Sequence, residues 1–326
     1  MNSNENSFNK LPDDVVLLIF RKLQDAKSLC ISMSVCRSFH SIVPRVSQVF
    51  LPMSPTKATL GKETVTSEIT FMNPVFRSLM KPFHGQFISQ MINLKSSKND
   101  SSYYQPNDVL KPFQEIRALH VRLPSHGNQK PSKTFLKWKA DFGDQLRSCV
   151  ILGAESWTEN KENFHQQRVI SDGEMKQRII WTISCLIAAS ARHHLVRETV
   201  KNQKMIENAV VSDESDQGRL CMNKQQIEEL KGSGGMCSGR FPAVRIKMWY
   251  SEKMEFPGCR KVMEGATLAV IWSAGSEEVE GWSAVDLVRA AFGGEGEEEE
   301  KVVGDLARKL LRAKECYVLE MNSFFN

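Results

Sequence analysis

The first apolar positions of the chain recur at the spacing of a helix. Pro12 stands where a first helical turn would begin, and Asp13 and Asp14 follow it, beside the positive end of the expected helix dipole. Apolar residues then continue to Leu23. The pattern therefore predicts a helix that begins near Pro12 and ends near Leu23.

Two shorter helices are expected directly after this one. Asp25 can cap the second helix, which places Leu29 on its apolar face. Ser34 can cap the third helix, whose narrow apolar stripe runs to Val43. Pro44 disfavours a longer helix because its ring removes a backbone donor and clashes with the preceding turn.

The rest of the chain alternates between segments typical of strands and segments typical of helices. Strands are expected at residues 48–51, 115–123, 134–140, 147–153, 244–250, 266–272 and 316–321. Helices are expected at residues 172–204, 224–231 and 301–312, with a weaker one at 74–92 that Pro82 and Gly85 interrupt. We therefore expect an α+β chain, in which a three-helix unit precedes a mixed or antiparallel sheet domain with packed helices.

Polar and glycine-rich stretches indicate how this chain is divided. We expect a flexible N-terminus at residues 1–10, the helical unit at 11–45 and one α+β domain at 46–326. Within that domain, flexible loops are expected near residues 95–110, 207–222, 232–240 and 293–300.

The helical unit carries more apolar surface than it can bury by itself. Residues 15–20 are six consecutive apolar residues, so apolar side chains surround most of the first helix. A unit below ~40 residues normally needs a disulfide, a metal or a partner to be stable. The surplus surface predicts an interface, either with another protein or with the larger domain of the same chain, and periodicity favours neither.

Composition excludes several classes of protein. The net charge of +5 comes from 43 basic and 38 acidic residues mixed along the chain, which does not indicate a nucleic-acid partner. The start of the sequence lacks the pattern of a secretory signal. The longest apolar stretch, residues 179–191, is shorter than the ~20 residues that cross a membrane and is expected to be a buried helix.

No catalytic, metal or cofactor site is predicted. The eight cysteines include no Cys-x-x-Cys pair, and His193 and His194 are adjacent, so they point to different faces of their helix. Cys149 lies in an apolar strand without a neighbouring base. Trp249 and Tyr250 could anchor a target, but aromatic residues on strands are more often part of a core.

The N-terminal residues resemble the F-box. The run Leu11-Pro12-Asp13-Asp14, the pair Val35-Cys36 and the apolar residues between and after them follow its order and spacing. The resemblance implies a three-helix module that docks on a Skp-type adaptor and, through it, on a cullin scaffold. The contact set that it implies is Leu11, Pro12, Ile19, Leu23, Leu29, Val35, Cys36 and Phe39.

Three later segments are similar to the plant auxin-up-regulated F-box group. They are FLKWKADFGDQLRSCVILG, GATLAVIW and YVLEMNSFF. The resemblance implies a non-catalytic substrate receptor of a Skp–cullin–F-box ubiquitin ligase, in the nucleus and/or cytoplasm, with an unknown protein target and no cofactor.

Two other functions are compatible with the sequence. The helical trio, with Arg37, His40 and Arg45 near its third helix, could be a helix-turn-helix that reads DNA, although its basic residues are few for that role. The larger domain could instead bind a small ligand, with the F-box serving a role outside a ligase.

Overall fold

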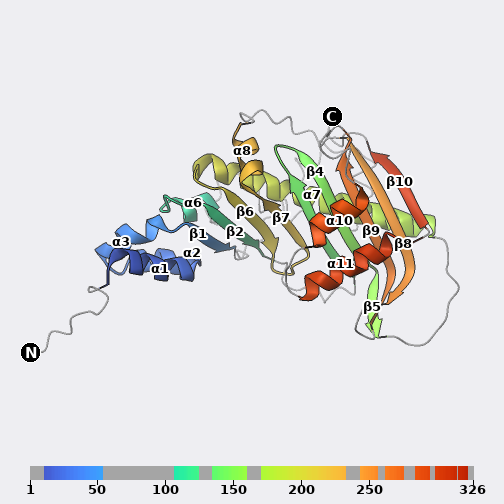
Figure 1. Ribbon diagram of the computed structural model, residues 1–326, viewed down its shortest axis with the longest axis horizontal. Helices are drawn as coiled ribbons and strands as arrows, with labels where there is room; N and C mark the ends of the chain where they lie inside the picture. The colour runs from blue at the N-terminus through green and yellow to red at the C-terminus, as the bar shows by residue number, and fades with distance from the viewer. Residues whose placement is uncertain are drawn as a thin grey trace, which may run out of the picture.

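The chain folds into a helical end joined to a long twisted sheet (Figure 1). The computed structural model describes residues 11–53, 106–124, 134–159, 170–232, 243–255, 261–274, 283–293, 298–313 and 315–321. Three short helices lie at one end, the sheet extends away from them, and further helices lie on both of its faces. The predicted α+β class, with a mixed sheet, is confirmed.

The helical end contains α1 (Asp13–Leu23), α2 (Ala26–Met33), α3 (Arg37–Ile42) and the 3-10 turn η2 (Val43–Arg45). The expected cap of α2 is confirmed, because Asp25 accepts a hydrogen bond from the Ser28 backbone N–H at 2.8 Å. The expected cap of α3 is wrong. Cys36 takes that position in place of Ser34, and its Sγ accepts a hydrogen bond from the Phe39 N–H at 3.4 Å.

The sheet has the strand order β1-β2-β6-β7-β3-β4-β9-β8-β10, and β5 pairs with β9 beside this path. The pairs β1–β2, β2–β6 and β3–β7 are parallel and the others are antiparallel. The strands are β1 (Gln48–Pro52), β2 (Ala118–Leu123), β3 (Phe135–Phe142), β4 (Leu146–Ala154), β5 (Ser156–Glu159), β6 (Asn208–Asp213), β7 (Gly218–Met222), β8 (Val244–Glu255), β9 (Lys261–Ser273) and β10 (Glu315–Met321).

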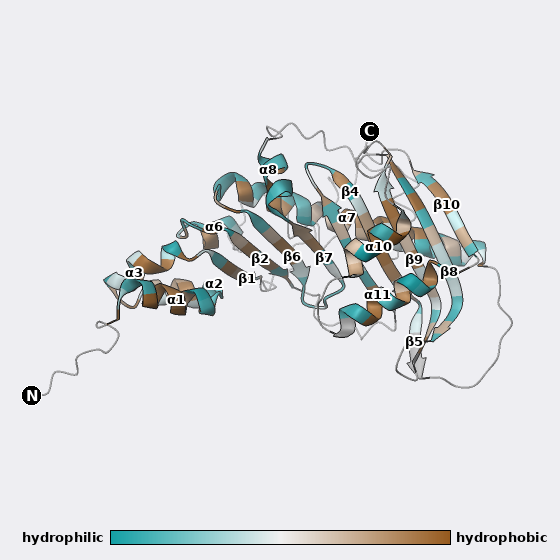
Figure 2. Cartoon of the chain, viewed as in Figure 1, coloured by the Kyte–Doolittle hydropathy of each residue, from teal (hydrophilic) through white to brown (hydrophobic). Residues whose placement is uncertain are grey.

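Helices cover the two faces of the sheet unequally. One face carries α6 (Pro106–Leu110), α7 (Asp172–Asn202) and α8 (Lys224–Gly232), whose apolar residues join one large core with the helical end. The other face carries α10 (Ala284–Phe292) and α11 (Glu298–Leu310), which form a second core with β4, β8 and β9. In Figure 2 both helices carry brown apolar and teal polar residues, and the residues that join the core include Leu287, Leu306 and Leu310.

The long helix α7 packs along the face of the sheet that also carries α6 and α8. Ser171 and Glu174 form a capping box at its start, and the helix begins at residue 172 as predicted. By length and composition α7 could cross a membrane, but 72% of its most apolar stretch is buried inside the protein. This burial agrees with the prediction of a core helix.

The α1–α2 turn is fixed to the edge of the sheet. The Phe50 N–H donates to the Gln24 carbonyl at 2.8 Å, and the Gln24 side chain donates to Gln48 at 2.8 Å. Gln24 has a φ of 52°, which turns the chain sharply between the two helices. The helical end and the sheet therefore share a hydrogen-bonded edge as well as a core.

Several expectations about loops were wrong. Residues 207–222 form the hairpin of β6 and β7 because the apolar positions in this polar stretch alternate, so that Ala209, Val211 and Leu220 face the core. Its tight turn contains Asp216 with a φ of 49°. Residues 106–110 and 298–300 belong to helices, and the helix expected at residues 74–92 lies outside the described residues.

Besides α6, β6 and β7, two further elements had not been expected, namely β5 and α10. α10 begins at a capping box of Ser283 and Asp286, a signal that was present in the sequence.

Trp249 and Tyr250 are both buried, as is common for aromatic residues on strands.

Arg178 is buried where α7 crosses β9. Its guanidinium donates to Glu155 at 2.8 Å, to the Thr267 hydroxyl at 2.9 Å and to the Glu174 carbonyl at 2.8 Å, and it lies over the Tyr250 ring at 4.8 Å. These contacts compensate the cost of burying the charge.

Replacement of Arg178 should destabilise the fold. Arg178→Met keeps much of the volume but leaves buried polar groups without their donor, so we expect the free energy of unfolding to fall by about 3 kcal/mol. Urea denaturation measures the loss. Lys176→Met, on the exposed side of the same helix, is the control and should change stability by no more than about 0.5 kcal/mol. Equal stability of the two variants would contradict the role assigned to Arg178.

Candidate adaptor-binding surface

The helix α1 presents apolar side chains on two opposite sides. Val16, Leu17 and Phe20 point into the core and are at most 5% exposed. The opposite side carries apolar residues at positions i, i+4, i+7, i+8 and i+12, which share one face of a helix. These side chains are between 38% and 57% exposed. We call them the exposed apolar face, which consists of Leu11, Val15, Leu18, Ile19 and Leu23.

More apolar surface follows at the end of α2 and in the turn to α3. Ile31 is 58% exposed and Val35 is 67% exposed. Phe39 is half-buried and packs edge-on against Phe20, with ring centroids 5.0 Å apart. The ring therefore anchors α3 on α1 while part of it stays accessible to a partner.

The implied contact residues do not all lie on the surface. Leu11, Pro12, Ile19, Leu23, Val35 and Cys36 are exposed, and Phe39 is half-buried. Leu29 is fully buried inside the helical module, so it supports the module from within. Residue types and order alone could not separate Leu29 from the rest, because burial depends on how α2 packs on its neighbours.

Three exposed apolar residues had not been singled out, namely Val15, Leu18 and Ile31. Val15 and Leu18 belong to the apolar run at residues 15–20, and their spacing from Leu11 would have placed them on its face of the helix. Ile31 has no comparable signal, because α2 has only eight residues.

Two other candidate chemical groups, Cys149 and His193, are buried in the sheet domain. Burial raises the pKa of the Cys149 thiol well above its ordinary value, which keeps it protonated and a poor nucleophile. His193 stacks on Phe142, with ring centroids 4.4 Å apart, and its Nε2 lies 3.0 Å from the Gly143 carbonyl. Among the described residues, no group of three or more His, Cys, Asp or Glu side chains is arranged to hold a metal ion.

Comparison with known proteins identifies the class of this chain. An F-box-like family model matches residues 8–47, which include all three N-terminal helices. The chain belongs to the F-box protein family. Membership implies that the N-terminal helices bind a Skp-type adaptor, and proteins of this family are typically non-catalytic subunits of ubiquitin ligases.

Particular relatives cover nearly the whole chain. F-box protein At4g18380 of Arabidopsis thaliana is 33% identical over 97% of this chain and 94% of its own length. F-box proteins AUF1 and AUF2 of the same plant are each 30% identical, over 98% and 97% of this chain and 99% of their own lengths. The resemblance to the auxin-up-regulated F-box group is thus confirmed. No solved structure matches the chain.

Buried and exposed leucines of the F-box should respond differently to substitution. Leu29→Ala creates a cavity in the module and should lower the free energy of unfolding by about 2–5 kcal/mol. Leu18→Gln changes an exposed side chain and should alter it by no more than about 0.5 kcal/mol. Urea denaturation of both variants tests this, and an equally large loss in Leu18→Gln would mean that the exposed apolar face is covered within the chain.

Acid should destabilise the protein through His193. Burial, with a further contribution from Arg197, lowers the pKa of His193 to about 4, whereas in the unfolded chain it is about 6.5. Its contribution to stability is therefore complete above about pH 6.5 and is lost, by up to about 3 kcal/mol, as the pH falls toward 4.

Unfolding measured between pH 4 and about 7 should be less pH-dependent in His193→Gln than in the native chain. His194→Gln, at the adjacent exposed position, is the matched control and should retain the native slope. An unchanged slope in His193→Gln would contradict the assignment.

Proposed function

We propose that this chain is the substrate receptor of a Skp–cullin–F-box ubiquitin ligase, acting in the nucleus and/or cytoplasm. The observation that carries the proposal is the two-sided packing of α1. One side packs on α2, α3 and η2, in a core that continues into the sheet domain, and the other leaves the exposed apolar face for a partner. An adaptor helix laid on this face would bury it by the same hydrophobic effect that stabilises the core.

The division of labour follows from this arrangement. The adaptor links the F-box to a cullin scaffold, and the sheet domain binds the protein target. The chain needs no catalytic group in this role, because it raises the effective concentration of the target near the conjugating enzyme. Family membership and the similarity to AUF1 and AUF2 over their whole lengths support the proposal.

Charge placed on the exposed apolar face should weaken adaptor binding strongly without unfolding the chain. In Ile19→Glu/Leu23→Glu, two carboxylates would have to be desolvated at the interface. We expect affinity for a Skp-type adaptor to fall by about 30-fold or more, as for an interface hot spot worth about 2 kcal/mol. Titration calorimetry with the purified adaptor measures this change.

Val285→Glu/Val318→Glu is the matched control. It makes the same change at two apolar side chains that are similarly exposed but lie on α10 and β10. Its adaptor affinity should equal that of the native chain, and circular dichroism should show both double variants folded. Native affinity in Ile19→Glu/Leu23→Glu would refute the proposed docking surface.

A further inference from the structure

Within the described part of the chain, no helix covers one half of the sheet on the face that α10 and α11 occupy elsewhere. In Figure 1 these two helices lie over the strands from β3 to β8, whereas no described helix lies in front of β1, β2 and β6. The alternate residues of these strands, such as Val49, Leu119 and Val211, face the core on the opposite side. We call the uncovered side of β1, β2, β6, β7 and the adjoining part of β3 the open face.

A row of cationic side chains crosses the open face. Strand register places Arg122 beside Ser212, Ser212 beside Arg219, and Arg219 beside Lys139. Lys139 is also the partner of Val150, which packs in the core of α10 and α11, so the row points to their side of the sheet. With strands about 4.8 Å apart, the row spans roughly 14 Å.

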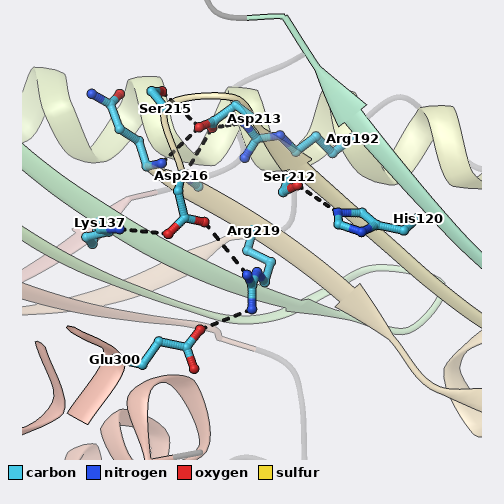
Figure 3. A network of polar contacts seen from close by, with 11 residues as sticks. His120, Lys137, Arg192, Ser212, Asp213, Ser215, Asp216, Arg219 and Glu300 are labelled. Atoms are coloured by element: carbon cyan, nitrogen blue, oxygen red, sulfur yellow. Dashed lines mark hydrogen bonds and ion pairs between the residues drawn. The ribbon is translucent and has the colours of Figure 1, made fainter. Parts of the chain in front are cut away.

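The chain itself shows that this row binds carboxylates. Figure 3 shows Arg219 between two acidic residues, with Glu300 of α11 at 3.1 Å and Asp216 of the β6–β7 turn at 3.7 Å. Arg122 and Lys139 form no ion pair with any described carboxylate. Arg122 lies over the Phe50 ring, 4.9 Å from its centroid. Among the described residues, the two ends of the row therefore lack a direct ion-pair partner, although Asp141 lies close enough to Lys139 for their charges to interact.

A hollow lies beside the row, where the F-box meets the sheet. Its volume is about 190 Å³, and Phe50, Ala118 and Val210 give it an apolar lining. Gln24 of the α1–α2 turn and Asn208 add polar groups to its lining. A hollow of this kind can hold one apolar side chain of a bound segment. Gln24 and Asn208 can then form hydrogen bonds with the backbone of that segment.

His120 separates the hollow from the cationic row. Its side chain lies 2.8 Å from the Ser212 hydroxyl and packs edge-on against Phe50. Burial lowers the pKa of His120, and the positive charges of Arg122 and Arg219 lower it further. The ring therefore stays neutral near pH 7 and leaves the cationic row to the arginines and Lys139.

We propose that the open face binds an extended acidic segment of the target protein, with carboxylates on Arg122 and Lys139 and one apolar side chain in the hollow beside Phe50. The inference rests on the proposed role as substrate receptor and names the chemistry of its target. A single-stranded nucleic acid is the alternative anionic occupant of this row, and the experiment below distinguishes it from an acidic peptide.

Binding of a defined peptide to the full chain tests the proposal. The probe is a fluorescein-labelled peptide in which glutamates flank a central phenylalanine, and fluorescence anisotropy measures its affinity. Arg122→Glu/Lys139→Glu should weaken binding at least tenfold, and added salt should weaken binding to the native chain. Ala118→Phe, which fills the hollow, should also weaken binding severalfold.

Two controls isolate the charge and the site. Lys176→Glu/Lys204→Glu makes the same change in net charge at two exposed lysines, one on α7 and one just after it, and should bind like the native chain. A peptide with glutamines in place of the glutamates should bind at least tenfold more weakly. Absence of peptide binding, equal binding of the two peptides, or equal losses in both charge variants would overturn the proposal, as would tighter binding of single-stranded RNA.

The same variants separate this inference from the proposed function. Arg122→Glu/Lys139→Glu should retain native affinity for the Skp-type adaptor, and Ile19→Glu/Leu23→Glu should retain native affinity for the peptide. Peptide binding without adaptor binding would leave the open face standing and refute the ligase role. Adaptor binding without peptide binding would support the ligase role and refute the proposed binding of an acidic segment on the open face.

Discussion

The structure depends on the way β1 joins the F-box to the sheet. This short strand pairs with β2 on one side, while the turn between α1 and α2 hydrogen-bonds to it through Gln24 on the other. Val49 and Leu51 carry its apolar side into the same core that contains Phe20 of α1. Without this joint the F-box would be a small helical unit with too little core of its own. With the joint, the module is anchored on one side and free on the other.

The two surfaces assigned here follow from that asymmetry. A helix with apolar residues around most of its circumference needs neighbours on two sides, and α1 packs on α2, α3 and η2 on one side only. On the sheet, α10 and α11 cover the strands far from the F-box, and no other described helix lies on that side of the strands near it. The exposed apolar face and the open face therefore both lie at the F-box end of the molecule, one made for apolar contact and the other for charge.

The sequence predicted helices and strands best where a local signal, such as a capping residue, occurs together with apolar positions that are buried in the core. The capping residues and helical spacing of α2 and α7 fixed their starts closely, and the apolar strands β4, β8 and β9 were expected near their true positions. The β6–β7 hairpin was missed because its polar residues outnumber the few that face the core.

The residues of the candidate site were also predicted only in part. Order and spacing indicated the F-box and were enough to place Leu18 on the face of Leu11, but only packing shows that Leu29 is internal. The cationic row joins residues from β2, β7 and β3, whose neighbourhood depends on strand order and could not be read from one-dimensional spacing.

The parallel strands near the F-box also bear on how the chain is assembled during synthesis. β1 pairs with β2, and β2 with β6, across long separations in sequence, and such pairings form late because a large loop must close first. The core beneath the F-box includes Leu110, Phe113 and Ile116, which leave the ribosome well after the three helices. The N-terminal module is therefore synthesised first but completed only when the middle of the chain has emerged, and a nascent F-box exposes on both sides the apolar surface that the finished protein exposes on one.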